Sequence, residues 1–324
     1  MEYAHLGRTG LQVSRLVLGT MNFGPETDEK DSFAIMDRAH EHGINFFDTA
    51  NVYGWVLGEG VTEQIIGRWM AQGGGRREKT VLATKLYNPM GTWPNEGRIS
   101  ALHIRRACDE SLRRLQTDHV DLYQLHHVDR EAPWDEVWEA MDVLRHQGKI
   151  TYVGSSNFAG WHIVQAQESA RRLGMLGLVS EQSRYNLFLR DLELEVLPAA
   201  QAYGVGVIAY SPLHAGLLSG VIRKEREGSR RHRDHAKAGL EAGRDRIERF
   251  EAFCEEELGE EPASVALAWL LTRPGLTGPI IGPRTMGQLD GAVRALEVQL
   301  DPASLTRLDE IFPGHLPAPE DYAW

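Results

Sequence analysis

The chain contains the stretch Asn45-Phe46-Phe47-Asp48-Thr49-Ala50-Asn51-Val52-Tyr53-Gly54, in which an apolar run ends abruptly at Asp48. With Ile44, the two phenylalanines are typical of a buried strand, and the turn residues His42-Gly43 and the polar run after Phe47 mark its ends. The stretch therefore predicts a strand that delivers a carboxylate, and in the following loop Tyr53, to its carboxyl end.

Apolar runs of this kind occur eight times in the chain, separated by amphipathic stretches with the spacing of helices. In order they are Leu16–Gly19, Ile44–Phe47, Thr80–Thr84, Val120–Leu125, Ile150–Val153, Gly177–Ser180, Val205–Tyr210 and Thr277–Ile281. Regular alternation of strand and helix favours parallel pairing with right-handed crossovers, and eight such strands close a barrel. The sequence therefore predicts the α/β class and a (β/α)8 TIM barrel.

An open doubly wound sheet is the competing architecture. Such a sheet usually carries a Gly-x-Gly-x-x-Gly turn after its first strand, and residues 19–24 do not have that spacing. Residues 4–13 predict a hairpin that closes the bottom of the barrel, and Asp301-Pro302 predicts the start of an additional C-terminal helix before the tail. No linker separates two independent cores, so we expect one domain over residues 1–324.

Composition narrows the class of protein. The 324 residues carry a net charge of −11, which gives nucleic-acid binding no electrostatic basis. No run of about 18 apolar residues predicts a membrane span, and Met1 to Gly7 does not resemble a secretory signal. Cys108 and Cys254 lie far apart in the sequence and fit reduced thiols of a cytoplasmic protein. The basic cluster at residues 223–233 is interrupted by acids and glycine and predicts a solvated, mobile loop.

Polar residues follow three successive strands, at the end of a barrel where active sites lie. Asp48 ends the second run and Tyr53 follows it, Lys85 ends the third, and His126 ends the fourth. Each of these side chains alone has an ordinary structural explanation. Their occurrence at equivalent strand ends predicts that they meet at one rim.

Such a group suggests proton transfer to a carbonyl oxygen. A tyrosine hydroxyl has a pKa of about 10 and is a poor acid unless a nearby cation favours its anion. Lys85 is that cation, and Asp48 keeps it charged and oriented. Tyr53 then donates a proton as hydride reaches the carbon, while His126 hydrogen-bonds the same oxygen. The sequence offers no convincing Ser or Cys triad.

The chain resembles the aldo-keto reductases. The resemblance rests on Asp48-Thr49-Ala50 with Tyr53-Gly54, Thr84-Lys85, Asp121 to His126, Gly154 to Phe158, Glu181-Gln182, Tyr210 to Leu213, and Ile281 to Thr285 with Gln288-Leu289. It implies a (β/α)8 barrel that reduces aldehydes or ketones with a nicotinamide cofactor. It also implies that Tyr53 is the acid, that Lys85 and Asp48 tune it, and that His126 orients the carbonyl.

The resemblance also implies cofactor contacts. Ser156, Asn157 and Gln182 match the family's residues for the nicotinamide carboxamide, and Tyr210 matches the ring that stacks on the nicotinamide. The segment from Ser211 to Leu217, with Leu213 and Gly216, is expected near the pyrophosphate, and Arg284 and Gln288 near the adenosine. A guanidinium suits a 2′-phosphate, which favours NADPH over NADH. Ala292 replaces an asparagine common in the family, which leaves the adenine contact and this preference open.

Aromatic residues in the loops after the strands are expected to line the substrate pocket. They are Phe23, Trp55, Trp93 and His127, with Tyr87, Trp134 and the tail up to Trp324 as further possibilities. Such walls suit a partly apolar small-molecule carbonyl or a sugar ring. The chain also resembles bacterial relatives that reduce keto-deoxysugar nucleotides. That substrate calls for positive charge, for which Arg98, Arg130 and Arg190 are available.

Two hypotheses from other classes remain. The chain also resembles potassium-channel β subunits, which predicts a cofactor-sensing regulatory subunit with weak turnover. A metal-dependent hydrolase would use His126, His127 and Asp129. Adjacent residues of a strand point to opposite faces, so these histidines are not expected to share one ion, and we expect no metal site.

Overall fold

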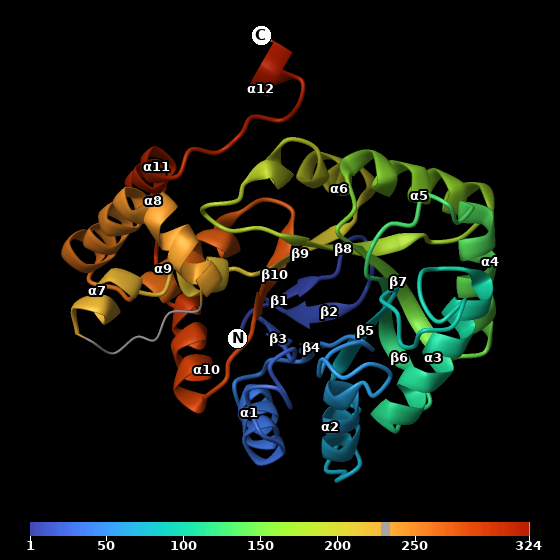
Figure 1. The fold of residues 1–324 in the computed structure, drawn as a ribbon. Helices are drawn as coiled ribbons and strands as arrows, with labels where there is room; N and C mark the ends of the chain where they lie inside the picture. The colour runs from blue at the N-terminus through green and yellow to red at the C-terminus, as the bar shows by residue number, and fades with distance from the viewer. Residues whose placement is uncertain (228–233, 324) are drawn as a thin grey trace.

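The computed structural model describes residues 1–227 and 234–323, and its centre is a closed barrel of parallel strands (Figure 1). In chain order the strands are β3 Val17–Gly19, β4 Phe46–Asp48, β5 Val81–Leu86, β6 Val120–Leu125, β7 Ile150–Ser156, β8 Leu178–Arg184, β9 Gly206–Tyr210 and β10 Leu276–Ile281. Each pairs with the next, and β10 closes the ring on β3. Each of the eight predicted runs overlaps one of these strands, so the predicted (β/α)8 barrel is confirmed and the open sheet is excluded.

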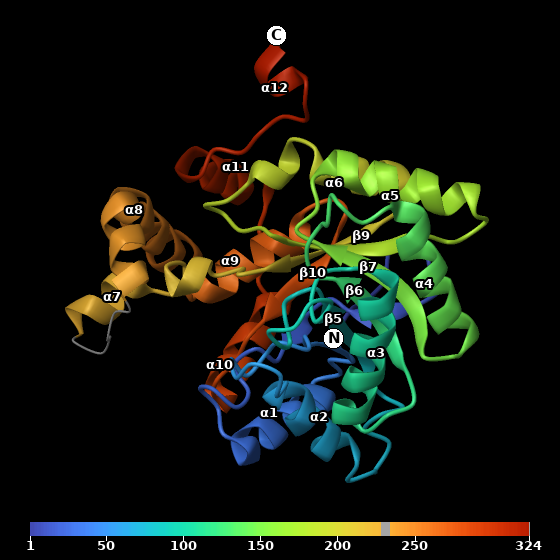
Figure 2. The same cartoon turned by 45° about the vertical axis from the view of Figure 1, so that its right-hand side comes forward.

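Helices surround this barrel in both ribbon views (Figures 1 and 2). Those that follow the strands are α1 Glu29–Glu41, α2 Val61–Met70, α3 Ala101–Leu115, α4 Trp134–His146, α5 Gly160–Arg172, α6 Val196–Tyr203, α9 Pro262–Thr272 and α10 Met286–Val293. Side chains fix several of their starts, as where Asp28 accepts a hydrogen bond from the Asp31 amide and Ser100 from the His103 amide. Within the described ranges, no helix is long and apolar enough to cross a membrane.

The long connection after β9 contains further helices, α7 Val221–Arg226 and α8 Asp234–Ala252. Arg223, from the predicted basic loop, lies in α7 and pairs with Glu261 at 2.6 Å. Residues 228–233 of that cluster lie outside the described residues. Pro262 is the first residue of α9, a position that suits proline because the amide of the first helical residue needs no partner within the helix.

The amino ends of the strands are closed by the predicted hairpin, whose strands β1 Tyr3–His5 and β2 Gln12–Ser14 pair antiparallel. Leu6 and Val13 of this hairpin are fully buried against side chains inside the barrel, among them Phe46, Ala83 and Leu122. A second, larger apolar layer fills the space between the barrel and its helices. The barrel interior is therefore filled by apolar side chains at its amino end.

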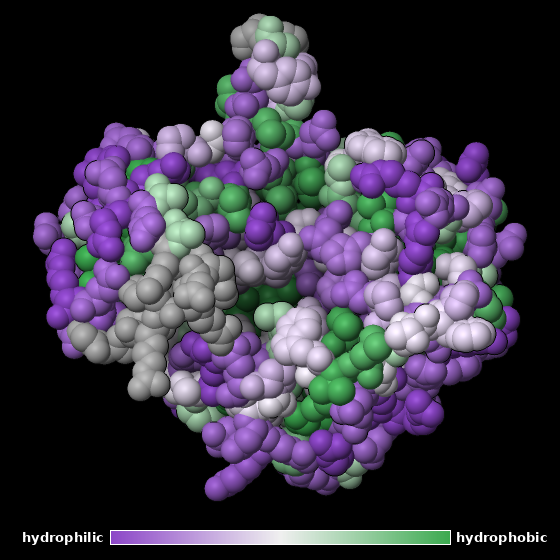
Figure 3. Space-filling view, in the orientation of Figure 1, coloured by the Kyte–Doolittle hydropathy of each residue, from purple (hydrophilic) through white to green (hydrophobic). Residues whose placement is uncertain are grey.

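After β10 the chain continues into α10 and the predicted additional helix, α11 Pro302–Ile311, where Asp301 accepts a hydrogen bond from the Ser304 amide at 2.8 Å. The tail then leaves the body and ends in α12 Glu320–Ala323, which stands away from it in both ribbon views (Figures 1 and 2). Figure 3, which has the orientation of Figure 1, shows a hollow near the middle of the molecule, with hydrophobic residues on its floor.

The hairpin turn predicts a sharp dependence of stability on Gly7. Its φ is +54°, and a Cβ there would lie 2.6 Å from the carbonyl oxygens of Gly204 and Val179. We expect Gly7→Ala to lower the free energy of unfolding by about 2–4 kcal/mol, because backbone strain and overpacking each cost roughly 1–3 kcal/mol. Gly10→Ala in the same turn is the control, since nothing lies within 4 Å of a Cβ there. Equal denaturation midpoints for the two variants would contradict this account.

Candidate functional site

One layer of inward-facing residues turns polar at the carboxyl ends of the strands. Side chains alternate along a strand, so the residue two positions after an inward apolar residue also faces inward. Along β4, Phe46 is followed in this way by Asp48, and along β5, Ala83 is followed by Lys85. The strand register aligns Lys85 with Gln124 and Ser156 with Gln182. Chain segments far apart in the sequence therefore deliver their polar side chains to the same level of the barrel.

Lys85 lies at the centre of this layer and is 0% exposed. Its Nζ donates to Asp48 Oδ2 at 2.5 Å, to the Thr49 carbonyl at 2.8 Å and to the Tyr53 hydroxyl at 3.3 Å. An ammonium has three N–H donors, so each has a partner here. Burial lowers the pKa of Lys85, but the attraction of Asp48 and Tyr53 outweighs it and the pKa is raised. The amine is therefore charged at neutral pH.

Two glutamines hold the other carboxylate oxygen of Asp48. Its Oδ1 accepts hydrogen bonds from Gln124 Nε2 at 3.0 Å and from Gln182 Nε2 at 2.8 Å. The resemblance assigned Gln182 to cofactor binding, and Gln124 was given no role from the sequence. The inward alternation that selects Lys85 also selects Gln124 on the neighbouring strand, and this signal was present in the sequence.

Tyr53 lies in the loop after β4, partly buried, with its ring tilted against that of Trp55. Burial raises the pKa of Tyr53, and the attraction of Lys85 lowers it without offsetting that rise. The expected influence of Lys85 on the pKa of Tyr53 is therefore present, but desolvation is the larger effect. Tyr53 keeps its proton at neutral pH.

His126 follows β6, and its ring lies edge-on to that of Tyr53 with centroids 6.1 Å apart. Burial, followed by the nearby Lys85 and His127, lowers the pKa of His126 to about 2. The imidazole is therefore neutral at physiological pH. Its Nδ1 is buried without a hydrogen-bond partner among the described residues.

The ring of His127 lies parallel to that of His126, with centroids 5.0 Å apart. The expectation that the two side chains point to opposite faces is wrong, because β6 ends at Leu125 and strand alternation stops there. Within the described part of the chain, no group of three or more His, Cys, Asp or Glu side chains is arranged to hold a metal ion.

Asn157 joins the ends of three strands. Its Nδ2 donates to the His126 carbonyl at 3.1 Å and to Ser156 Oγ at 3.0 Å, and its Oδ1 accepts from the Tyr210 hydroxyl at 2.8 Å. Asn157 adopts a left-handed φ of 62°, a conformation that asparagine tolerates better than most residues. The residues assigned to the nicotinamide by resemblance, Ser156, Asn157, Gln182 and Tyr210, therefore form one connected cluster beside Asp48.

The segment after β9 has an unusual backbone. Ser211 has a φ of 51°, and Gly216, at the end of a short helical turn that starts at His214, has a φ of 89°. Asn186 Nδ2 holds the Ser211 carbonyl at 2.9 Å. Leu213 is partly buried against the core. The segment assigned to the pyrophosphate is thus a strained, well-anchored turn directly after Tyr210.

Arg284 and Gln288 lie together after β10. The Arg284 amide donates to Gln288 Oε1 at 2.8 Å, and the exposed guanidinium pairs with Glu26 at 2.8 Å. Sequence reasoning missed Glu26. Ala292 is buried in the apolar layer between the barrel and its helices, which is consistent with a packing role for this side chain.

The predicted pocket residues divide into two groups. Phe23 is 0% exposed in the hydrophobic core, which corrects its assignment to a pocket wall. Trp134 likewise packs against other aromatic rings, those of Trp138 and Phe158. Trp55 and Trp93 are 60% and 77% exposed, in loops after β4 and β5. The ring of His127 contacts that of Tyr87 at the same rim. Trp324 lies outside the described residues.

The arginines considered for a nucleotide substrate are mostly paired. Arg190 is buried and bonds Glu193 at 2.9 Å and Asp309 at 2.5 Å. Arg98 is paired with Asp129 and Glu131, whereas Arg130 is exposed.

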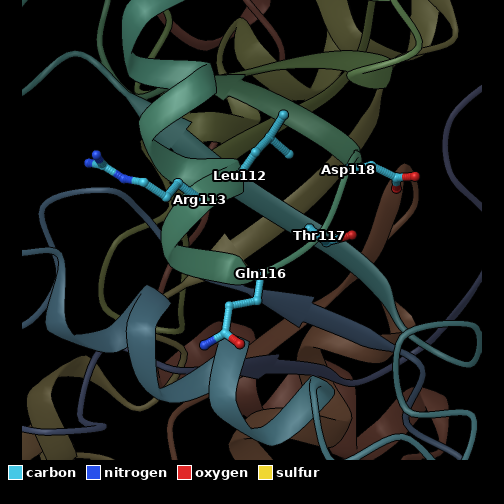
Figure 4. Close-up of a pocket in the computed structure, with 5 residues that line it drawn as sticks. All are labelled: Leu112, Arg113, Gln116, Thr117 and Asp118. Atoms are coloured by element: carbon cyan, nitrogen blue, oxygen red, sulfur yellow. The ribbon is translucent and has the colours of Figure 1, made fainter.

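A separate surface hollow lies at the carboxyl end of α3. Its lining residues are Leu112, Arg113, Gln116, Thr117 and Asp118 (Figure 4). These residues immediately precede β6, so the hollow is at the amino end of that strand, whereas His126 follows its carboxyl end. The hollow is therefore not part of the polar layer around Lys85.

Comparison with known proteins agrees with this geometry. The model of the aldo/keto reductase family matches residues 15–312. The chain is 55% identical to the uncharacterized oxidoreductase YrpG of Bacillus subtilis (strain 168), over 100% of both chains. It is 31% identical to a probable voltage-gated potassium channel subunit beta of Arabidopsis thaliana, over 99% of this chain and 100% of that one. It is 33% identical to a versiconal hemiacetal acetate reductase of Aspergillus parasiticus, over 96% of each. The chain therefore belongs to the aldo/keto reductase family and is an oxidoreductase.

Proposed function

We propose that this chain reduces an aldehyde or ketone to the alcohol, with NADPH as the hydride source and Tyr53 as the proton donor. The observation that carries the proposal is the hydrogen-bond pattern at Tyr53. Its oxygen accepts from Lys85 Nζ, and among the described residues its own proton has no acceptor. That proton is available to a carbonyl oxygen at the mouth of the barrel.

The charges around Tyr53 support its role as an acid. Its raised pKa keeps the hydroxyl protonated before the reaction. As the proton leaves, the phenolate that forms lies 3.3 Å from the charged Lys85 amine. An ion pair in a water-poor site stabilises this developing charge much more than the neutral hydroxyl, which lowers the barrier to transfer.

His126 has a different task. A neutral imidazole has one N–H donor, which is suited to hold and orient a carbonyl oxygen beside the Tyr53 hydroxyl. An imidazolium next to Lys85 would add a second positive charge, which the lowered pKa of His126 prevents.

The chemistry of the donors fits a nicotinamide cofactor. Asn157, Gln182 and Ser156 offer the amides and hydroxyl that pair with a carboxamide, and Tyr210 offers a ring at the end of β9. When bound, the cofactor supplies the hydride. Tyr210 and Asn157 are bonded to each other, so we propose that cofactor binding rearranges this contact. Arg284 is the residue proposed to bind the 2′-phosphate.

The substrate that we propose is a partly apolar carbonyl compound. The loop after β4 exposes Trp55, Val56 and Leu57 next to Tyr53, and an apolar rim favours a ligand with apolar surface. The pairing of Arg190 and Arg98 weakens the case for a nucleotide-sugar substrate, because a diphosphate needs available cations.

A regulatory, cofactor-sensing subunit is the second candidate, favoured by the similarity to potassium channel β subunits. It would bind NADPH and oxidise it slowly. Multiple turnovers in a steady-state assay with a panel of aldehydes and ketones distinguish the enzyme from such a subunit.

The role of Tyr53 predicts that Tyr53→Phe lowers kcat by about 10²–10⁴-fold, the usual contribution of a general acid. NADPH binding, measured by fluorescence titration, should be retained because the ring remains. Tyr203→Phe is the control, since that hydroxyl bonds Glu168 in α5. Turnover of Tyr53→Phe equal to wild type would exclude Tyr53 as the acid.

The role of Arg284 predicts a selective loss of affinity. Arg284→Ala should weaken NADPH binding by about 10- to 100-fold, since a hydrogen bond to a charged group contributes roughly 1.5–3 kcal/mol. NADH binding should change much less. Arg294→Ala removes another exposed arginine that is paired with acids, Glu260 and Glu297, and is the control. Equal weakening of both nucleotides by Arg284→Ala would refute the 2′-phosphate assignment.

The environment of His126 predicts that its ring does not titrate between pH 5 and pH 8, because the pKa is lowered to about 2. In NMR spectra of wild-type protein, the ring signal that is missing from His126→Gln should keep its chemical shift over this range. A shift with a midpoint inside the range would show that the imidazole takes up a proton there and would remove the basis for its neutral role.

A further inference from the structure

The loop between β3 and α1 is fastened to the segment that carries Arg284. Asn22 Nδ2 donates to the Gly282 carbonyl at 2.9 Å, and Thr27 Oγ1 contacts the Arg284 carbonyl at 3.4 Å. Between these two contacts, Glu26 Oε2 accepts a hydrogen bond from Arg284 Nη1 at 2.8 Å. The two segments are therefore joined by two side-chain-to-backbone contacts in addition to one ion pair.

The position of Glu26 is fixed by its own loop. The amides of Glu26 and Thr27 both donate to the Asn22 carbonyl at 3.0 Å, and the Gly24 amide donates to the Thr27 carbonyl at 2.8 Å. Phe23 and Thr27 are buried, so the loop is anchored at two points on either side of Glu26. The carboxylate is thereby held at Arg284 by the fold of the loop as well as by its charge.

The ion pair is accessible to a competing anion. The side chains of Arg284 and Glu26 are 46% and 27% exposed, and ion pairs with this much exposure are weak. A guanidinium carries five N–H donors, and the contact with Glu26 uses Nη1. A phosphate can therefore reach Arg284 either by displacing the carboxylate or by binding next to it.

We infer that Glu26 sets the cofactor selectivity of this enzyme by competing with the 2′-phosphate of NADPH for Arg284. The inference rests on the proposed function, in which Arg284 binds that phosphate. A phosphate dianion beside a carboxylate experiences like-charge repulsion, so Glu26 reduces the affinity gained from the 2′-phosphate. NADH has a hydroxyl at this position and leaves the Glu26–Arg284 pair intact. Glu26 thus narrows the difference in affinity between NADPH and NADH.

Glu26→Gln tests this inference, because it removes the charge and keeps the size and polarity of the side chain. We expect 2′,5′-ADP and NADPH to bind about fivefold or more tightly to Glu26→Gln, with 5′-AMP and NADH within about twofold of wild type. Isothermal titration calorimetry at low ionic strength measures all four affinities, and added salt should reduce the difference.

The matched control is Glu29→Gln, which makes the same change in net charge three residues later, at an acid that pairs with Arg68 at 2.7 Å. It should leave all four affinities within about twofold of wild type. In the Arg284→Ala background, Glu26→Gln should have a clearly smaller effect, because competition for the guanidinium is gone and only the direct repulsion between carboxylate and phosphate remains.

Two results would overturn the inference, and they are distinguishable. If wild-type protein binds NADPH, and Glu26→Gln leaves the NADPH to NADH affinity ratio unchanged or lowers it, Glu26 does not compete with the phosphate. Lowered affinity would show that Glu26 orients Arg284 for binding. If wild-type protein binds neither nucleotide, or Arg284→Ala leaves the ratio unchanged, the proposed function fails at this site and the inference fails with it.

Discussion

The polar end of this barrel depends on the burial of one ammonium group. A charge removed from water costs several kcal/mol unless good partners surround it, and Lys85 is completely buried. Its three donors therefore impose conditions on the surrounding structure. Asp48 must lie at the end of β4, the turn after it must aim the Thr49 carbonyl inward, and the same turn must return Tyr53 to within reach. The glutamines on Asp48 meet the corresponding requirement of the carboxylate. The residues of this layer depend on one another, because each supplies a hydrogen-bond partner that another one needs.

The lower part of the barrel strengthens these interactions. Below Asp48 and Lys85 the interior is apolar, and the hairpin residues Leu6 and Val13 seal its amino end. The polar layer is therefore bordered by buried apolar side chains on its amino-terminal side. Electrostatic interactions are stronger in such a medium, and an unpaired polar group there is correspondingly costly. The apolar packing that stabilises the barrel thus also determines the strength of the contacts among Lys85, Asp48 and Tyr53.

Sequence reasoning located the strands well because buried parallel strands leave continuous apolar runs, and it placed Asp48, Lys85 and His126 because strand ends follow those runs. It did not identify the partners of these residues. The pairing of Gln124 with Asp48 depends on the register of β5 and β6, and the pairing of Glu26 with Arg284 depends on the closure of β10 on β3. Strand alternation indicates that Gln124 faces inward, but neither pairing can be derived from the sequence alone. Exposure was also hard to judge, since Phe23 resembles a loop aromatic by position yet lies in the core. The effect of burial on the pKa of Tyr53 could not be predicted from the sequence, because desolvation depends on packing.

Under the proposed function, an aldehyde or ketone binds close to Lys85, and a lysine in that position is a chemical hazard. An unprotonated amine attacks a carbonyl carbon and forms an imine, which would modify the enzyme with its own substrate. Lys85 is protected from this reaction by the arrangement around it. Its raised pKa keeps the nitrogen lone pair occupied by a proton, and its three N–H groups point at Asp48, Thr49 and Tyr53. The same hydrogen bonds that make Lys85 an electrostatic partner of Asp48 and Tyr53 therefore keep it chemically inert toward the proposed carbonyl substrate.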